Sequence, residues 1–435
     1  MKLKHILPIL LMFYSIASAS SLKEVKAEIE KILNRLNAST KVGLLIYNPL
    51  TRDTLFNVNH RQSMIPASNT KLFTTAVALE IMGGDYLLST KLYTDDDNLS
   101  DGEINGNLYI KGFGNSTFTS EDLEKMVDHL NELNIKSITG DIIGDDTYFD
   151  EVYTRDDWIR DERANVKLPP VSALVLDRNK TTVTKKRRGR YRTYFVYVSD
   201  PPTFVAKELK NELSKNDIKV EGSYKKGETP KNAYLITEAS IELRELIKQI
   251  NKHSDNFLAE CLFKTIGAVY SGEQGNSFYS TQAILSFIKD NGIFSEGTSV
   301  VDGSGISRFD QITVGALIGL LEKMYFDIAN FDDFYNALSI AGIDGTLEDR
   351  MRRSPAQNNF HGKTGTLNGV SSVSGYVTTK DGEDLIVSII FQFERGGQYM
   401  HRDIQDEIIK ALADLNEESP DDIDQQDFEK KFDTN

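Results

Sequence analysis

The 435-residue sequence predicts an α+β protein in which helices cover an antiparallel sheet and strand-rich insertions interrupt the sheet domain. Two observations predict this class. Helical and strand patterns occur together at both ends of the chain, so the simplest assembly is one sheet to which both ends contribute. The middle of the chain carries short alternating strands instead, and the length of the chain accommodates two or three domains.

The N-terminal part of the sheet domain combines one helix and two strands. Apolar residues recur at helical spacing over residues 22–36. The runs 41–48 and 53–59 read as two strands, and the short turn 49–52 joins them.

The C-terminal part supplies the matching strands and a closing helix. Strands at 370–379 and 384–393 flank a turn, and residues 402–415 predict a helix. We therefore expect one discontinuous domain that consists of residues 20–89 and 236–416.

The segment between these two parts, residues 90–235, has a different character. Short alternating strands at 106–112, 141–146 and 193–200 accompany an amphipathic helix at 120–134. This region predicts one or more inserted domains. The alternative is a single large continuous domain.

The two ends of the chain predict an exported protein with an acidic tail. Residues 1–19 combine two lysines, an apolar run and a small-residue cleavage site, which predicts a removed signal peptide; a buried N-terminal helix is the alternative. The expected location is a periplasm or the outer face of a single-membrane cell, without stable membrane insertion, because the apolar run is too short to span a bilayer. Residues 417–435 are acidic and poor in apolar residues, which predicts a disordered tail.

Composition excludes several classes of partner. A net charge of -15 argues against a nucleic-acid-binding protein. The six histidines are scattered and the chain has one cysteine, so we expect no metal, no cofactor and no disulfide. Cys261 lies in an apolar helical stretch, where a small buried hydrophobe is favoured over a nucleophile.

One basic segment stands out in this acidic chain. The sequence TKKRRGRYR at 184–192 lies between two strand-like runs, which predicts the tip of a hairpin. Its charge either contacts the carboxylates of an anionic polymer or is simply solvated, and solvated charge is the commoner case.

The first candidate for chemistry is the pair Ser68 and Lys71 in PASNTKLFTT, at the predicted start of a helix after Pro66. A spacing of three brings both side chains to one helical face. A serine hydroxyl needs a base to act as a nucleophile, and a lysine serves if burial or a second cation lowers its pKa. A helix N-terminus also favours an oxyanion.

Two later triplets supply the other groups that such a site requires. Ser254, Asp255 and Asn256 lie between two helical runs, and Lys363-Thr364-Gly365 opens a strand. Each triplet alone is commonly structural, as a surface pair, a helix cap or a turn. Their order and their structural contexts agree with one another, which predicts a serine acyl-transfer site.

With these segments the sequence resembles the class C low-molecular-mass penicillin-binding proteins, the serine D-alanyl-D-alanine carboxypeptidase and endopeptidase family of bacterial cell walls. The likeness extends to IPASNTKLFTTAVALEIMG, PPVSALVLDRN, VDGSGISR and IAGIDGTLEDRM and covers most of residues 22–415. It implies a serine β-lactamase/DD-peptidase transpeptidase-like catalytic domain with residues 90–235 inserted. It also implies peptidoglycan stem peptides as substrates and β-lactams as covalent inhibitors.

The resemblance implies roles for the catalytic residues. Ser68 attacks the carbonyl between two D-alanines, with Lys71 as general base. Ser254 passes a proton towards the leaving amine, Asn256 holds the substrate amide and positions Lys71, and Lys363 lowers the pKa of its neighbours.

The resemblance also implies a substrate-binding strand. Lys363 and Thr364 hold the terminal carboxylate, and the backbone N–H groups of Ser68 and Thr366 form the oxyanion hole. Gly365 lets the substrate backbone lie close to the strand.

Two local features lie beside this pattern. His361 precedes Gly362 where a small or basic residue is expected. The segment DGSGISR orders a loop near the site, and Asp302, Ser304 and Arg308 within it are interpreted as structural.

Two other functions use the same residues. A serine β-lactamase of one branch needs an E-x-x-L-N segment between the second and third triplets, and none occurs between Asn256 and Lys363. A catalytically retired wall-binding or scaffolding protein is the other alternative, although such proteins usually lose the nucleophile or the base.

Overall fold

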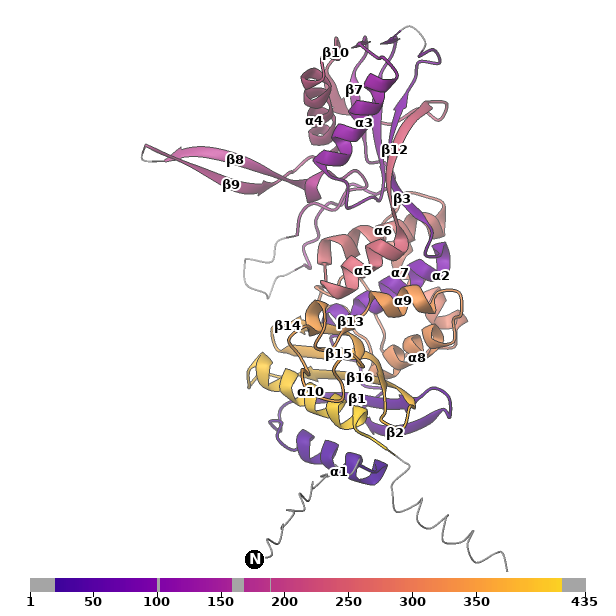
Figure 1. Cartoon of the computed structure of the whole chain (residues 1–435), viewed down its shortest axis with the longest axis vertical. Helices are drawn as coiled ribbons and strands as arrows, with labels where there is room; N and C mark the ends of the chain where they lie inside the picture. Colours follow the sequence, from indigo (N-terminus) through magenta and orange to yellow (C-terminus); the bar gives the residue numbers. More distant parts are fainter. Residues whose placement is uncertain (1–19, 100–101, 159–167, 188, 417–435) are drawn as a thin grey trace, which may run out of the picture.

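The computed structural model describes residues 20–99, 102–158, 168–187 and 189–416. The predicted signal peptide and acidic tail therefore lie outside the described residues. Figure 1 shows an elongated molecule in which a layer of helices separates two sheets.

The larger sheet contains strands from both ends of the chain. Its order is β13-β14-β15-β16-β1-β2, and all of its pairs are antiparallel. Its strands are β1 (Lys41–Asn48), β2 (Asp53–Val58), β13 (Ser339–Ile340), β14 (His361–Leu367), β15 (Val370–Thr378) and β16 (Asp384–Gln392). Because β1 pairs with β16, with Lys41 opposite Gln392, the predicted contribution of both chain ends to one sheet is confirmed.

Helices α1 (Leu22–Leu33) and α10 (Gln398–Ala413) cover one face of this sheet. Ile29 of α1 and Ile408 of α10 belong to the same buried cluster as Leu44 of β1. The predicted first helix begins at Leu22 because Ser21 accepts the backbone N–H of Glu24 and Glu24 reaches back to the Ser21 N–H.

The helical layer packs against the other face of the sheet. Its elements are η1 (Ala67–Asn69), α2 (Thr70–Met82), α5 (Leu243–Lys252), α6 (Asn256–Ser271), α7 (Ser277–Asp290), α8 (Val314–Tyr325) and α9 (Phe331–Ala337). The short turn η3 (Gly345–Leu347) instead packs its Leu347 in the cluster of α1 and α10. Helix α2 is buried from Thr70 to Leu79, so it forms the centre of the layer. Its apolar side chains pack with those of α5, α6, α7 and α8 in one cluster.

The second sheet lies beyond the helical layer and has the order β11-β7-β5-β3-β12. Its strands are β3 (Leu87–Thr94), β5 (Leu108–Phe113), β7 (Ile142–Asp145), β11 (Tyr224–Lys226) and β12 (Tyr234–Glu242). A small parallel sheet adds β4 (Glu103–Ile104), β6 (Ser137–Ile138) and β10 (Lys219–Val220). Helices α3 (Ser120–Glu132) and α4 (Pro201–Lys215) share a separate apolar cluster with these strands.

Strands β3 and β12 carry the chain out of the helical layer and back into it. They pair with each other, with Leu87 opposite Glu242. The predicted domain limits at residues 89 and 236 fall within these two strands, and the division into domains remains a prediction.

A two-stranded hairpin leaves the body of the molecule beside the second sheet (Figure 1). The short turn η2 (Asp177–Asn179) leads into β8 (Lys180–Arg187), whose one strand partner among the described residues is β9 (Arg190–Tyr197). The predicted strand at 193–200 thus begins earlier and ends at Tyr197, because Asp200 already caps α4 by accepting the backbone N–H of Thr203.

Within the described ranges, none of the helices combines the length and apolar character that a membrane crossing requires.

Candidate active site

Ser68 lies in a tight turn that the sheet holds in place. A helical turn starts after Pro66, as predicted, but it is the 3-10 helix η1, so Ser68 and Lys71 belong to two consecutive elements, η1 and α2. Ala67 has φ of 50°, a left-handed conformation that an α-helix cannot contain. Two side-chain contacts keep this turn in place: Ser372 Oγ donates to the Pro66 carbonyl at 2.7 Å, and Asn69 Nδ2 donates to Ser374 Oγ at 2.8 Å.

Lys71 is fully buried beside Ser68. Its Nζ lies 3.0 Å from Ser68 Oγ, 2.7 Å from Asn256 Oδ1 and 2.6 Å from the Ser304 carbonyl oxygen. A neutral amine has two N–H groups and one lone pair. Because the contacting atoms, Asn256 Oδ1 and the Ser304 carbonyl oxygen, are acceptors, they take both N–H groups and leave the lone pair for the Ser68 hydroxyl.

Burial makes the neutral form of Lys71 accessible. Removal from water lowers the pKa of this amine to about 8, although the carboxylates of Asp302 and Glu260 act in the opposite direction. The lysine can therefore accept a proton from Ser68 near neutral pH.

Ser254 and Lys363 form a second buried pair. The loop between α5 and α6 holds Ser254 at a φ of 55°, and Lys363 Nζ donates to Ser254 Oγ at 2.9 Å and to the Thr364 carbonyl at 2.8 Å. Burial, followed by the positive charge of Lys71, lowers the pKa of Lys363 well below its usual value. Burial is the first cause of both shifts, and the charge of Lys71 adds to the lowering for Lys363, whereas the expected effect of Lys363 on the pKa of its neighbours stays a prediction.

Asp255 connects this loop to Arg178 of the turn η2. Its carboxylate caps α6 by accepting the Leu258 N–H at 3.0 Å, and it forms an ion pair with Arg178 at 2.8 Å. Sequence reasoning did not identify Arg178, because a residue 77 positions away gives no local signal of this contact.

The strand β14 offers an open edge beside Ser68. Among the described residues, β13 pairs with β14 only at His361 and Gly362, which leaves the edge from Lys363 onwards without a strand partner. A Cβ added to Gly365 would lie 2.8 Å from the Pro66 carbonyl oxygen and 3.0 Å from the Ser68 nitrogen. Only glycine permits this close approach of β14 to the serine.

The two threonines of β14 differ in exposure and partners. Thr364 is half-buried and its hydroxyl donates to Thr346 Oγ1 at 2.8 Å. Thr366 is exposed, and its hydroxyl accepts a hydrogen bond from Arg402 Nη2 at 3.1 Å. Arg402, on α10, was not among the residues that the sequence pattern identified.

The loop after α7 brings a carbonyl to the base, and buried carboxylates hold that loop. Asp302 accepts the N–H groups of Gly305 at 2.6 Å and Ser307 at 2.8 Å, while Glu260 accepts that of Ser304 at 2.8 Å. Asp302 therefore has the structural role that the sequence predicted. Ser304 contributes more than predicted, because its carbonyl oxygen contacts Lys71.

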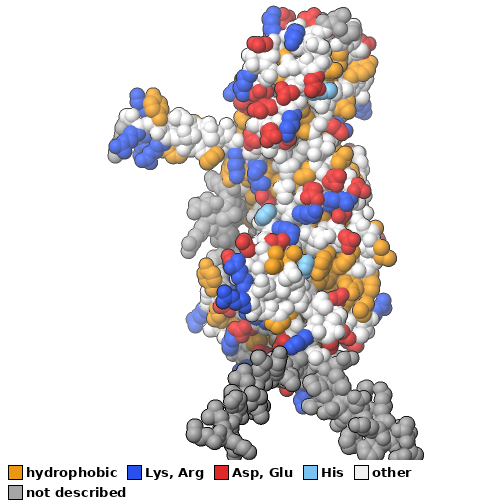
Figure 2. All heavy atoms as spheres, in the orientation of Figure 1, with side chains coloured by type: hydrophobic (Ala, Val, Ile, Leu, Met, Phe, Trp, Pro, Cys, Tyr) orange, Lys and Arg blue, Asp and Glu red, His pale blue; other side chains and the backbone are white. Residues whose placement is uncertain are grey.

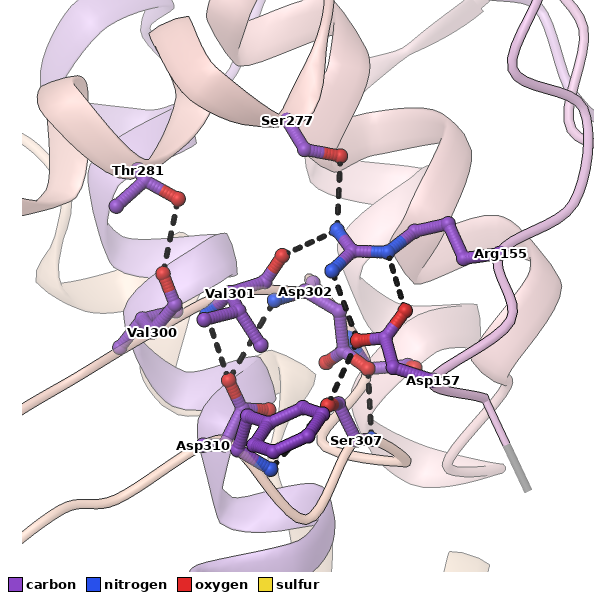
Figure 3. Close-up of polar contacts among 12 residues, drawn as sticks. Arg155, Asp157, Ser277, Thr281, Val300, Val301, Asp302, Ser307 and Asp310 are labelled. Carbon is purple, nitrogen blue, oxygen red and sulfur yellow. Dashed lines mark hydrogen bonds and ion pairs between the residues drawn. The ribbon is translucent and has the colours of Figure 1, made fainter. Parts of the chain in front are cut away.

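Figure 3 shows how Arg155 and Asp157, which follow β7 in the chain, hold the same loop. Arg155 forms an ion pair with Asp157 at 2.8 Å and donates to Ser277 Oγ at 3.0 Å and to the Val301 carbonyl. Asp157 in turn accepts the Ser307 hydroxyl at 2.8 Å. Residues that follow β7 in the chain thus support the loop that contacts the base.

The remaining sequence candidates lie outside this arrangement. The His361 ring stacks on Tyr335 with 4.1 Å between centroids, and burial lowers its pKa. Cys261 is buried as predicted, and burial raises the pKa of its thiol. In the part of the chain that the structure describes, no group of three or more His, Cys, Asp or Glu side chains is arranged to hold a metal ion.

The arrangement has the parts that nucleophilic acyl transfer requires: a serine beside a buried amine, a second serine–lysine pair and an open strand edge for a peptide. The structure brings together all three sequence triplets, through Lys71 with Asn256 and Lys363 with Ser254.

Comparison with known proteins agrees with this arrangement. The sequence profile of the D-Ala-D-Ala carboxypeptidase 3 (S13) family matches residues 25–194 and 186–415. The chain is 27% identical to the D-alanyl-D-alanine carboxypeptidase of Actinomadura sp. (strain R39) over 469 aligned positions, which cover 92% of this chain and 86% of that protein.

Solved structures share the fold. The crystal structure of penicillin-binding protein 4 from Haemophilus influenzae matches with a TM-score of 0.77 at 21% identity and covers 88% of this chain and 99% of its own. A complex of that protein with a β-lactam matches with a TM-score of 0.71 at 20% identity, over 88% of this chain and 98% of its own. This likeness confirms the α+β fold class.

Proposed function

Because the chain belongs to the D-Ala-D-Ala carboxypeptidase 3 (S13) family of serine-type peptidases, we propose that Ser68 is its nucleophile and that the reaction passes through a serine acyl-enzyme. The proposed substrates are peptidoglycan stem peptides that end in D-alanyl-D-alanine. The observation that carries this assignment is the 3.0 Å distance between Ser68 Oγ and the buried Nζ of Lys71.

In the acylation step, Ser68 Oγ attacks the carbonyl carbon between the two D-alanines while the neutral amine of Lys71 accepts its proton. The C–N bond then breaks. Ser254 delivers a proton to the departing nitrogen and is supplied through its contact with Lys363, at 2.9 Å. The terminal D-alanine leaves as a free amino acid, and water later hydrolyses the ester.

The oxyanion of the tetrahedral intermediate is expected between the backbone N–H groups of Ser68 and Thr366. The close packing of Gly365 against the η1 turn supports this assignment, because it brings the strand to the serine backbone. Asn256 has two tasks: it orients Lys71 and accepts or donates to the substrate amide.

The substrate carboxylate is expected at the open edge of β14, near Lys363, Thr364 and Thr366. Arg402 adds a cation there, since it contacts the exposed Thr366 and has no carboxylate partner among the described residues. A guanidinium at this position favours a free terminal carboxylate through a charge-assisted contact. We therefore propose carboxypeptidase activity first, with cleavage of cross-links as a second activity of the same site.

Covalent inhibition by β-lactams follows from the same chemistry. The relative from Haemophilus influenzae is named a penicillin-binding protein and was solved with a β-lactam, which supports the proposal for this chain. Since the sequence lacks the segment that activates water in one β-lactamase branch, the acyl-enzyme with penicillin is expected to be long-lived. We also propose that residues 1–19 direct export and that the enzyme acts outside the cytoplasm.

The test combines labelling and product release. The protein is incubated with a fluorescent penicillin and, separately, with a soluble pentapeptide that ends in D-Ala-D-Ala. We expect a covalent label and free D-alanine from the wild type and from Ser214→Ala, an exposed serine on α4, and neither from Ser68→Ala. A wild type without label and without D-alanine release would instead identify a retired wall-binding protein.

Mass analysis of muropeptides separates the two hydrolytic activities. Digestion of intact peptidoglycan is expected to shorten pentapeptides to tetrapeptides. Loss of dimeric muropeptides in the same digest would add endopeptidase activity. Rapid turnover of nitrocefin would contradict the expected long-lived acylation.

A further inference from the structure

The hairpin of β8 and β9, which we call the basic hairpin, has a charge opposite to that of the chain. Its described residues, 180–187 and 189–197, include six Lys or Arg and no Asp or Glu, whereas the chain has a net charge of -15. Figure 2 shows basic side chains gathered at the end of this projection, away from the mixed charges of the body. Five cations occupy the distal half: Lys185, Lys186, Arg187, Arg190 and Arg192.

These five cations are exposed, and none forms an ion pair within the part of the chain that the structure describes. Strand register places Arg187 opposite Arg190 and Lys185 opposite Arg192. Like charges directly opposite each other destabilise a strand pair. An anionic partner would remove this repulsion, which gives the basic hairpin a reason to bind one.

Aromatic side chains accompany the charge. Phe195 is 83% exposed and Tyr191 is 71% exposed, and the register places both on one face of the basic hairpin. A two-stranded hairpin buries little on its own in water, so exposed aromatic rings on it indicate a contact surface rather than a core.

The root of the basic hairpin is tied to the candidate active site. Arg178, two residues before β8, pairs with Asp255 at 2.8 Å, and its guanidinium lies 5.0 Å from the centroid of the Phe257 ring. Asp255 lies between Ser254 and Asn256. The basic hairpin therefore starts beside the catalytic loop and extends outward from it.

We propose that the basic hairpin binds the anionic glycopeptide of the wall, so that a polymer strand is held next to the stem peptide in the cleft. The choice of the wall polymer as the partner rests on the proposed function. The cations contact free carboxylates of stem peptides, and the aromatic rings cover apolar faces of sugar rings. An anionic membrane fits less well, because interfacial aromatic residues reach deeper than cations. Here Tyr191 lies among the five cations of the tip, and the other exposed aromatic residues, Tyr194, Phe195 and Tyr197, lie nearer the root.

The experiment measures co-sedimentation with purified peptidoglycan in the Ser68→Ala background, which does not digest the polymer. The test variant replaces Lys185, Lys186, Arg187 and Arg190 with serine. A matched control replaces four exposed lysines without ion pairs on other elements, listed here: Lys23, Lys207, Lys231 and Lys289. Both variants lose four positive charges, so only the location differs.

We expect the test variant to lose roughly tenfold in affinity and the control variant to remain within about twofold of the wild type. Amidation of the peptidoglycan carboxylates and added salt should reproduce the loss, because exposed charges are screened. At high salt, where charges are screened and the aromatic contribution to binding remains, a Phe195→Ser variant should bind peptidoglycan more weakly than the wild type does.

Equal binding by the test and control variants would overturn the inference. So would an unchanged affinity for peptidoglycan together with a loss of binding to phosphatidylglycerol vesicles, since that result assigns the hairpin to a membrane. A separate assay distinguishes failure of the proposed function. With Ser68 intact, the test variant should release D-alanine from a soluble tripeptide at the wild-type rate. Absence of release from both the wild type and the test variant would reject the enzyme assignment while the binding result stands.

Discussion

The pKa of Lys71 makes the catalytic proposal quantitative. At a pKa of about 8, roughly one amine in eleven is neutral at pH 7, whereas the ordinary value of 10.5 would leave about one in three thousand. The neutral fraction rises about tenfold between pH 7 and pH 9. If Lys71 is the general base, kcat/KM for D-alanine release must follow this fraction, since kcat/KM reports groups of the free enzyme.

The assay is release of D-alanine from a soluble tripeptide between pH 5 and pH 10, with circular dichroism at each pH to confirm that the protein stays folded. The sign follows from the chemistry: the protonated amine cannot accept the Ser68 proton, so activity falls as the pH falls below 8. We expect a slope of about one log unit per pH unit on the acid side and a plateau above pH 9.

The matched variant is Lys71→Arg, which keeps a cation but stays protonated at every pH in this range. It should lose activity by about a thousandfold or more without recovery at high pH. A profile that is flat from pH 6 to pH 9, a midpoint above pH 10, or a Lys71→Arg enzyme with a tenth of the wild-type activity would refute the reasoning.

Three further outcomes follow from the site. Gly365→Ala should lower kcat by about a hundredfold, because the added Cβ moves β14 away from the Ser68 backbone, whereas Gly397→Ala, which has open space, should change it little; equal effects would contradict the oxyanion assignment. Arg178→Ala should reduce the free energy of unfolding by about 1 kcal/mol or less, as a partly exposed pair, and should lower kcat more than it raises KM; a change in KM alone would argue against positioning of the catalytic loop. Arg402→Ala should raise KM about tenfold for peptides with a free terminal carboxylate but not for amidated ones, and an equal effect on both would remove its role.

Much of the fold was predictable because its signals are local. The alternation and apolar runs at 41–48 and 384–393 depend on which side chains face a core, and both became strands, β1 and β16, in one sheet. The capping box of Ser21 and Glu24 likewise acts over three residues. What could not be read locally was the turn at Ala67, whose positive φ depends on distant contacts of η1 with β15.

The site divides in the same way. The sequence by itself determined the chemical groups: a serine with a lysine three residues later, a polar triplet between helices, and a lysine and threonine that open a strand. It also determined that Gly365 lies on that strand. These are properties of residue type and short spacing, which covalent geometry converts directly into local structure.

Tertiary structure decided how those groups behave. Only packing brings Lys71 to Asn256, 185 residues away, and Lys363 to Ser254, 109 residues away. Only packing supplies the Ser304 carbonyl, and only the surrounding chain removes the water that would keep Lys71 protonated. The pKa of a side chain is a property of its environment, because burial disfavours charge, and that environment is assembled from segments whose proximity no local pattern encodes.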